Sequence, residues 1–319
     1  MSNQILIFGA GAWGTALALH VARAGYHVHL WTRKTFPLPS GAMPCLPEFP
    51  LPTTVRVSSE LPTASWCCVL IAIPTQSIAS IMPLLPKGVP TLLCCKGIEK
   101  SSLSFPLDIL ARNRPDISGA VLSGPNFAHE IAAGLPAASV IAASEVAYAR
   151  IFVEKLATPL FRLYTSSDIT GVQLGGAAKN VIALAAGITM GANLGENARA
   201  ALITRGLAEI TRLALSLGAQ PTTLAGLSGL GDLLLTCTSH VSRNYQLGFD
   251  LGKGVSLHKA ILDLPGVAEG VTTASALLAL ARTYQVDVPL TECITAFLEG
   301  QINLTEAQKL LLSRPIKDE

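Results

Sequence analysis

Lysines in two short segments of this chain are candidates for acid–base chemistry. Lys179 follows Gly175-Gly176-Ala177-Ala178 on an apolar stretch with a helical pattern, and Lys96 follows a β-rich run. Small residues let a helix approach a ligand closely, and burial lowers the pKa of a lysine toward a value useful for proton transfer. We expect Asp232 to hold the Lys179 ammonium. The alternatives are a Lys179 ammonium that reaches solvent from a buried helix and an Asp232 that only caps a helix over 233–236.

The stretch Gly9-Ala10-Gly11-Ala12-Trp13-Gly14 matches the dinucleotide-binding pattern G-x-G-x-x-G. It directly follows the apolar run Ile5–Phe8 and opens a helical pattern, as a βαβ unit requires. We expect Gly9 to make the tight turn, Gly11 to let the backbone approach the pyrophosphate, and Gly14 to let helix and strand pack closely. The phosphates would lie at the helix N-terminus, where N–H groups favour negative charge. The alternative is a glycine turn without a ligand.

The residues after the second predicted strand bear on which dinucleotide binds. An NAD-specific site has Asp or Glu there to bond the ribose 2′-OH, whereas this chain has Thr32-Arg33-Lys34. A guanidinium can pair with a 2′-phosphate through two parallel hydrogen bonds. We therefore predict that Arg33 lets NADP(H) bind at least as well as NAD(H). The alternative is that Arg33 only caps a solvated turn.

Other polar residues stand in segments where they could contact a substrate. Ser242-Arg243-Asn244 offers a hydroxyl, a guanidinium and an amide at adjacent positions near a predicted helix start. Lys96 lies just past the C-terminal end of a strand, the usual ligand edge of such a sheet, and Gly124 would let a substrate approach the backbone. These segments lie where a nucleotide-binding domain could face a helical one. An exposed arginine at a helix start is the alternative for Arg243.

Several strings in the chain together resemble the bacterial sn-glycerol-3-phosphate dehydrogenase family of NAD(P)-linked enzymes. They are Cys95-Lys96-Gly97-Ile98-Glu99, Ser123-Gly124-Pro125-Asn126-Phe127-Ala128, Gly175-Gly176-Ala177-Ala178-Lys179-Asn180, Gly229-Leu230-Gly231-Asp232, Ser242-Arg243-Asn244 and Val267-Ala268-Glu269-Gly270. The resemblance covers essentially the whole chain. It implies an enzyme that reversibly reduces dihydroxyacetone phosphate to sn-glycerol 3-phosphate with NAD(P)H and so supplies phospholipid synthesis.

The resemblance also implies that Lys179 is the general acid and base. With the residue-level arguments above, it leads us to expect substrate contacts from Lys96, Gly124, Asn126, Lys179, Asn180, Asp232, Thr236, Ser242, Arg243 and Asn244. We expect cofactor contacts from Gly9, Gly11, Ala12, Trp13, Gly14, Arg33, Lys96, Ala128, Arg243, Val267 and Glu269. Ala12 stands where the family often has serine, so its contact would be through the backbone.

Two other functions remain open at this point. A ketopantoate-type reductase would share the layout but would need a pocket for a carboxylate. A non-catalytic NADPH sensor would keep the three glycines but would have no reason to keep Lys179 with Asp232 and Arg243. Turnover of dihydroxyacetone phosphate, compared with ketopantoate and with simple binding, distinguishes the three.

Eight β-rich runs in the first half of the chain predict the sheet that must position these residues. They are Ile5–Phe8, Val28–Trp31, Val55–Ser58, Cys68–Ile73, Thr91–Cys95, Ala120–Leu122, Ala138–Ala142 and Leu160–Tyr164. Several are apolar throughout, as in parallel strands buried on both faces. Between the first two lies a helical stretch, Gly14–Ala24, and the repeated strand–helix–strand order indicates a doubly wound sheet. Six prolines in 34–54 predict an irregular crossover, where relatives often carry a helix.

After Thr165 the pattern turns helical and no convincing strand follows. The predicted helices cover Gln173–Met190, Arg199–Leu217, Leu230–Cys237, Asn244–Leu251, Ser256–Leu262, Thr272–Tyr284, Pro289–Leu298 and Glu306–Ser313. The predicted fold is therefore an α/β Rossmann-like doubly wound domain, residues 1–167, followed by an all-α domain, residues 168–319.

Composition excludes several classes of protein. Half of the residues are hydrophobic and 14% are charged, unlike a disordered chain. The net charge of +2 and the absence of a basic patch argue against a nucleic-acid partner. The mean hydropathy of +0.47 raises the question of a membrane span, but prolines cut the longest uncharged run, 61–86, and the apolar stretch 180–195 is interpreted as a buried helix.

The seven cysteines form no C-x-x-C pair, and no histidine lies at metal-ligand spacing from them. We therefore expect buried thiols in a reducing compartment and no metal site. The N-terminus has no basic segment or cleavage site of a signal peptide. A cytoplasmic location is the expectation, and the apolar helical half together with the family suggests a homodimer.

Overall fold

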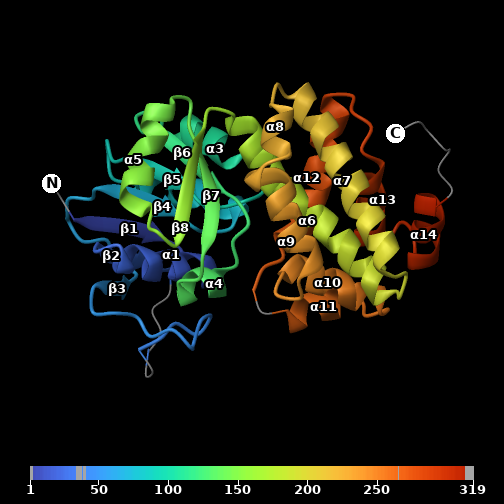
Figure 1. Ribbon diagram of the computed structural model, residues 1–319, viewed down its shortest axis with the longest axis horizontal. Coiled ribbons are helices and arrows are strands. Elements are labelled where there is room, and N and C mark those ends of the chain that lie inside the picture. Colours follow the sequence, from blue (N-terminus) through green and yellow to red (C-terminus); the bar gives the residue numbers. More distant parts are fainter. Residues whose placement is uncertain (1–2, 34–37, 39–40, 265, 313–319) are drawn as a thin grey trace. The chain divides into compact units, whose positions relative to one another are not determined.

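A computed structural model describes residues 3–33, 38, 41–264 and 266–312 of the chain (Figure 1). The chain divides into two compact units. The first comprises Met1–Lys96 and Ser104–Gln173, and the second comprises Gly97–Leu103 and Leu174–Glu319. The predicted domain limits, 1–167 and 168–319, stay a prediction.

The first unit is built on one eight-stranded sheet, with strand order β3-β2-β1-β4-β5-β6-β7-β8. The strands are β1 (Gln4–Phe8), β2 (His27–Trp31), β3 (Val55–Ser58), β4 (Cys68–Ile71), β5 (Thr91–Leu93), β6 (Gly119–Ser123), β7 (Ala137–Ala142) and β8 (Phe161–Ser166). Their first six follow the doubly wound order 3-2-1-4-5-6, so the predicted fold class is confirmed. All eight predicted strands are present, although β4 and β5 each end two residues earlier than predicted.

One feature of the sheet has no counterpart in the prediction. Each neighbouring pair is parallel except β6 and β7, which are antiparallel, and β8 then runs parallel to β7. The last two strands therefore run opposite to the other six. A strand's direction depends on the path of its connection, which the alternation of residue types does not encode.

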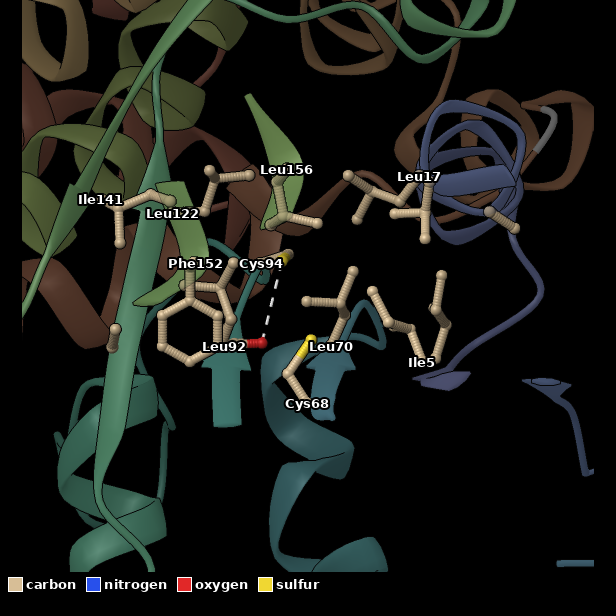
Figure 2. Packing of buried hydrophobic residues seen from close by; sticks show 14 of the residues in the cluster. Ile5, Leu17, Cys68, Leu70, Leu92, Cys94, Leu122, Ile141, Phe152 and Leu156 are labelled. Carbon is tan, nitrogen blue, oxygen red and sulfur yellow. Dashed lines mark hydrogen bonds between the residues drawn. The ribbon is translucent and has the colours of Figure 1, made fainter. Parts of the chain in front are cut away.

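Helices cover both faces of the sheet. On one face, α1 (Ala12–Arg23) and α5 (Val146–Leu156) contribute Leu17 and Phe152 to a cluster with residues of the central strands, among them Leu70 (Figure 2). On the other face lie α2 (Ile78–Ile81) and α3 (Pro106–Asn113). A further helix, α4 (Ala128–Ala133), packs on α1. Strands buried on both faces explain the uniformly apolar runs in the sequence.

The described part of the proline-rich crossover is irregular, as predicted. It forms one isolated antiparallel bridge, between Ala42 and Pro50, and no helix. Leu46 is buried and packs with Phe49 against residues of α1 and α4. Residues 34–37 and 39–40 lie outside the described residues.

The second unit is helical, and no strand occurs among its described residues. Its helices are α6 (Ile169–Gly191), which belongs to this unit from Leu174 onward, α7 (Glu196–Ser216), α8 (Pro221–Leu224), α9 (Asp232–Thr238), α10 (Arg243–Gly252), α11 (Leu257–Asp263), α12 (Glu269–Thr283), α13 (Pro289–Leu298) and α14 (Leu304–Leu312). The eight predicted helices correspond to α6, α7 and α9–α14, while α8 was not predicted and Ser313 lies outside the described residues.

Helix α6 is long and apolar enough to cross a membrane by length and composition alone. However, 94% of its most apolar 18-residue window is buried inside the protein. Its side chains from Val172 to Thr189 are buried, including those on the faces that would be polar in a surface helix. A helix that is apolar all round is expected at the centre of a helical core, and this placement agrees with the interpretation of the stretch as a buried helix.

The cysteines are free thiols, but not all of them are buried. Cys45 is exposed, and Cys67 and Cys95 are half-buried. The expectation of buried thiols is therefore wrong for these three. Cys45 lies in the irregular crossover and Cys95 just beyond the end of β5, where the chain leaves the packed layers.

Candidate active site

The glycine turn after β1 has the geometry that a dinucleotide needs. Gly9 has a φ of +108°, and a Cβ there would lie 2.5 Å from the Ala72 carbonyl oxygen. A Cβ on Gly14 would overlap the Gly9 carbonyl, so both glycines are required by packing within the protein. Gly11 differs, because no heavy atom lies within 4 Å of its Cβ position. Its missing side chain leaves open space beside the backbone, which fits a bound pyrophosphate.

The start of α1 also fits an anion. Gly11 is the N-cap residue, no side chain caps the helix, and its first turn holds no acidic residue. Its first N–H groups therefore have no side-chain acceptor, and the helix dipole adds positive potential. Trp13 in this turn donates its indole N–H to the Cys94 carbonyl at 3.0 Å, which ties the turn to the end of β5. Arg33 is exposed just after β2, and Lys34 lies outside the described residues.

A second polar group of the first unit lies beyond β5 and β6. The Lys96 ammonium donates to the Gly124 carbonyl at 2.9 Å, and the Asn126 side-chain nitrogen donates to the same oxygen at 3.3 Å. Asn126 also donates to the Ser139 hydroxyl on β7. Gly124 has a φ of +149°, and a Cβ there would lie 2.9 Å from Ser139. Ser139, which the sequence did not single out, thus contacts Asn126 and adjoins Gly124.

The second unit places Lys179 in an enclosed polar cluster. Its ammonium bonds the carboxylate of Asp232 and the hydroxyl of Thr236, the latter at 2.9 Å. Lys179 is 7% exposed and Asp232 is fully buried. The Thr236 hydroxyl donates to the Asp232 carbonyl at 2.6 Å, so one of its lone pairs is directed to the ammonium. The predicted contact between Lys179 and Asp232 is present, and the alternative of an ammonium in solvent is wrong.

Asp232 owes its position to a π-helical turn, Leu227–Gly231, that precedes α9. The turn packs against α6, since a Cβ on Gly175 would lie 2.5 Å from the Ser228 carbonyl oxygen. The N-cap residue of α9 is Gly231, with helical backbone angles and no side-chain cap. Asp232 therefore does not cap the helix, and that alternative is wrong. The sequence signal for the turn was the cluster of glycines between 226 and 231.

Glycines also bring α6 and α10 into backbone contact. A Cβ on Gly187 or Gly191 of α6 would overlap carbonyl oxygens of α10, and a Cβ on Gly248 would overlap the Leu184 carbonyl of α6. Gly252 meets the Ile188 carbonyl in the same way. Two glycines spaced four apart on each helix thus face each other. The close approach sets where the residues at the start of α10 lie relative to Lys179 on α6.

Asn180, Asn244 and Gly270 form a buried hydrogen-bonded chain across three helices. The Gly270 backbone N–H at the start of α12 donates to Asn244 Oδ1 at 2.9 Å. Asn244 Nδ2 donates to Asn180 Oδ1 at 3.0 Å. Along the chain, each of the three directly follows a residue that was predicted to belong to the site, namely Lys179, Arg243 or Glu269. Gly270 was quoted as part of a string but was not expected to take part in the site.

Ser242 and Arg243 lie at the start of α10. Ser242 is the N-cap residue, and its hydroxyl accepts from the Tyr245 N–H at 3.3 Å. Arg243 is exposed, and its guanidinium lies against Gly266, where a Cβ would come within 2.8 Å. Gly266 precedes Val267, which is 53% exposed. Arg243 is thus an exposed residue at a helix start that also adjoins the segment predicted to reach the cofactor.

The charge of the cluster in the second unit comes from the Lys179–Asp232 pair. Burial raises the pKa of the neighbouring Cys237 thiol far above its usual value, which keeps the thiol neutral at physiological pH. Among the described residues, no three His, Cys, Asp or Glu side chains lie together as metal ligands would. The arrangement offers an enclosed cation able to transfer a proton, with amide and guanidinium donors on neighbouring helices.

Comparison with known proteins shows the family. The model of the NAD-dependent glycerol-3-phosphate dehydrogenase N-terminus matches residues 4–149, and that of the C-terminus matches residues 168–309. The chain belongs to the NAD-dependent glycerol-3-phosphate dehydrogenase family.

Relatives of this family match along almost their whole length. The chain is 49% identical over 317 residues to a glycerol-3-phosphate dehydrogenase [NAD(P)+] of Gluconobacter oxydans, covering 98% of this chain and 97% of that one. The crystal structure of glycerol-3-phosphate dehydrogenase from Coxiella burnetii is similar with a TM-score of 0.93 and 36% identity, covering 98% and 99% of the two chains. The dehydrogenase family therefore accounts for both halves of the chain.

The ketopantoate reductase alternative shares only the fold. A ketopantoate reductase of Ralstonia eutropha has a TM-score of 0.58 and 19% identity, with coverage of 96% of this chain and 99% of that chain. At that identity the likeness says nothing about substrate. The layout of a Rossmann-like unit followed by helices is thus common to reductases of different specificity, and the site residues must decide between them.

Proposed function

We propose that this protein reduces dihydroxyacetone phosphate to sn-glycerol 3-phosphate with NADH or NADPH, and runs the reverse reaction when product accumulates. The observation that carries the proposal is the enclosed Lys179 ammonium, held by Asp232 and Thr236. Membership in the family supports the substrate assignment. The reaction would supply the glycerol backbone of phospholipids. A cytoplasmic location stays a prediction from the sequence, and a homodimer stays a prediction from the apolar helical half and the family.

In this mechanism the first unit binds the dinucleotide. The open space at Gly11 and the uncapped start of α1 fit the pyrophosphate. Ala12, Trp13 and Gly14 belong to the same turn, while Lys96, Arg33, Ala128, Val267 and Glu269 are proposed as further cofactor contacts. When bound, the nicotinamide supplies or accepts the hydride.

The second unit supplies the proton and binds the substrate. Hydride addition to the ketone carbon leaves an alkoxide, and Lys179 protonates that oxygen as a general acid. In the reverse direction the neutral amine removes the proton. Asp232 and Thr236 hold the Lys179 nitrogen so that the proton is presented from a fixed point.

Cationic and amide donors are proposed for the substrate phosphate and hydroxyl groups. They are Ser242, Arg243 and Asn244 at the start of α10, with Asn180 on α6 and with Lys96, Gly124 and Asn126 in the first unit. Arg243 suits a phosphate because its planar guanidinium donates two parallel hydrogen bonds. Its exposed position leaves those donors accessible.

Substitution of Lys179 by methionine tests the proposal. Methionine fills similar space but cannot carry a proton, so kcat for reduction of dihydroxyacetone phosphate should fall by about 10²–10⁴-fold. The Kd of NADPH, measured by fluorescence titration, should stay unchanged. Lys259→Met, at an exposed position on α11, is the matched control and should keep the wild-type rate.

Two results would contradict the proposal. One is a kcat close to that of the wild type in the Lys179→Met variant. The other is wild-type protein that oxidises NADPH with ketopantoate and not with dihydroxyacetone phosphate. Binding of NADPH without turnover of either ketone would instead indicate a sensor.

A further inference from the structure

A single backbone N–H, that of Gly270, fixes which way the side-chain amides of Asn244 and Asn180 are turned. A backbone N–H can only donate, so the Gly270 N–H requires an oxygen opposite it, and Asn244 Oδ1 fills that place. The Asn244 nitrogen must then point away from Gly270, toward Asn180. Because that nitrogen donates, Asn180 has to accept with its own oxygen. One backbone donor thus sets the orientation of two successive amides.

The consequence concerns the other end of Asn180. Its oxygen is occupied by Asn244, and its side-chain nitrogen donates to no residue in the part of the chain that the structure describes. Asn180 is 6% exposed and lies next to Lys179 on α6. The hydrogen-bonded chain of Gly270, Asn244 and Asn180 therefore ends in an amide donor on the residue that follows the proposed acid in α6.

We infer that Asn244 is a positioning residue, which orients Asn180 so that its amide N–H, and not its oxygen, is offered to the substrate oxygen that becomes the alkoxide. This inference rests on the proposed function and deepens it. A fixed donor aimed at developing negative charge stabilises the transition state without having to reorient during the reaction. A flipped Asn180 would present an oxygen and repel the same charge.

The role is separate from the direct contact proposed between Asn244 and the substrate phosphate, which would use the second N–H of the Asn244 amide. Asn244 Oδ1 and one N–H are engaged with the protein, and Asn244 is 8% exposed. Its neighbour Gly270 is required for the same reason, since a Cβ there would lie 2.7 Å from Asn244 Oδ1. The Asn244 side chain thus connects α6, α10 and the start of α12 through its hydrogen bonds.

Substitution of Asn244 by aspartate isolates this effect. Aspartate has the same shape and still accepts from the Gly270 N–H, but its second oxygen cannot donate to Asn180. Asn180 would then turn its nitrogen toward Asp and its oxygen toward the substrate. We expect kcat for dihydroxyacetone phosphate to fall by about 100-fold, with KM changed far less, because the lost interaction forms in the transition state.

A double-mutant cycle separates positioning from other effects. In the Asn180→Ala background the donor is already gone, so the fold-loss of kcat from adding Asn244→Asp should be about 10-fold smaller than in the wild type. The new negative charge of Asp, or a lost phosphate contact, would act in both backgrounds alike. Asn303→Asp is the control, because Asn303 is exposed and uses its oxygen to accept from the Glu306 N–H; it should keep the wild-type kcat.

The outcomes are distinguishable. Equal fold-losses from Asn244→Asp in the wild-type and Asn180→Ala backgrounds, a rise in KM without loss of kcat, or an unchanged kcat would each overturn the positioning role. Wild-type protein without activity on dihydroxyacetone phosphate would overturn the proposed function itself. If thermal unfolding shows that Asn244→Asp does not fold, Asn244→Ser replaces it in the same cycle, since serine is too short to make both contacts.

Discussion

In the buried ion pair of Lys179 and Asp232, each charge depends on its partner. Removing one partner would leave the other charge uncompensated inside the protein, which typically costs about 3–5 kcal/mol. Thr236 adds a hydroxyl that accepts from the ammonium. Such a cluster stabilises a fold poorly compared with apolar packing, so its presence at the centre of a helical unit agrees with a chemical role.

Arg33 carries the residue-scale prediction about the cofactor. Because no carboxylate follows β2, the sequence predicts that the Arg33 guanidinium binds the 2′-phosphate of NADP(H). Arg33→Ala should lower kcat/KM for NADPH by about 10-fold, the scale of one charge-assisted hydrogen bond, and should leave kcat/KM for NADH nearly unchanged. Steady-state kinetics with both cofactors gives the two ratios. An equal change for the two would mean that Arg33 only occupies a solvated turn.

At the scale of elements, the crossing of α6 and α10 sets the position of the second unit's polar residues. Glycines on both helices let the backbones touch, and the start of α10 then lies beside the middle of α6. Gly25 in the first unit has another role. With a φ of +92°, it ends α1 in a Schellman-type turn. Glycine thus serves close approach in one case and a backbone turn in the other.

Gly248→Ala tests the crossing. The added methyl would overlap the Leu184 carbonyl, so the two helices would have to separate. Overpacking of this kind typically costs about 1–3 kcal/mol, and kcat should fall as well, because Asn244 moves with α10. Urea unfolding followed by circular dichroism gives the change in free energy.

Gly226→Ala is the matched control for the crossing. Its new Cβ would lie 3.4 Å from the nearest atoms, an ordinary contact, and φ at Gly226 is −93°. This variant should keep the wild-type stability to within about 1 kcal/mol. Equal stability of the Gly248→Ala variant and the wild type would show that α6 and α10 are not in backbone contact.

At the scale of the whole molecule, high hydropathy follows from how much of the chain is enclosed. The sheet of the first unit is buried on both faces, and α6 of the second is buried all round. A chain with such elements needs apolar residues at positions that a surface helix or a one-sided sheet would make polar. The mean hydropathy of +0.47 is therefore a property of the cores.

Buried histidines make stability depend on pH. Burial lowers the pKa of His20 below its ordinary 6.5, and its ring donates to the Leu156 carbonyl at 2.7 Å; burial lowers the pKa of His29 too. Below about pH 6.5 the unfolded chain takes up protons that the folded state does not. The free energy of unfolding should therefore fall as pH drops from 6.5 toward the folded pKa values, and this contribution is fully present above 6.5.

His20→Gln provides the test of that dependence. Glutamine keeps an N–H donor but does not titrate, so the slope of stability against pH below 6.5 should become shallower, by at most about 1.4 kcal/mol per pH unit. His258→Gln, at an exposed position on α11, should leave the slope as it is. Chemical unfolding at several pH values gives the slopes. A slope in His20→Gln as steep as that of the wild type would remove His20 as the cause.

By itself the sequence determined the local features of this protein. It predicted strands from the apolar runs, the glycine turn from its flanking strand and helix, and a helix from the small-residue stretch around Lys179. Each of these features depends on residues that are neighbours along the chain. The sequence also led us to expect that Asp232 could hold the Lys179 ammonium, because a carboxylate can pair with a buried cation. The strings shared with the family added the substrate.

Tertiary structure alone decided the rest. The reversed direction of β7 and β8, the π-turn that buries Asp232 instead of making it a cap, and the approach of Gly187 to α10 depend on contacts between residues far apart in the chain. The direction of the Asn244 amide depends on a backbone N–H 26 residues away. Such contacts form only when separate elements pack together, so no spacing within one segment can encode them.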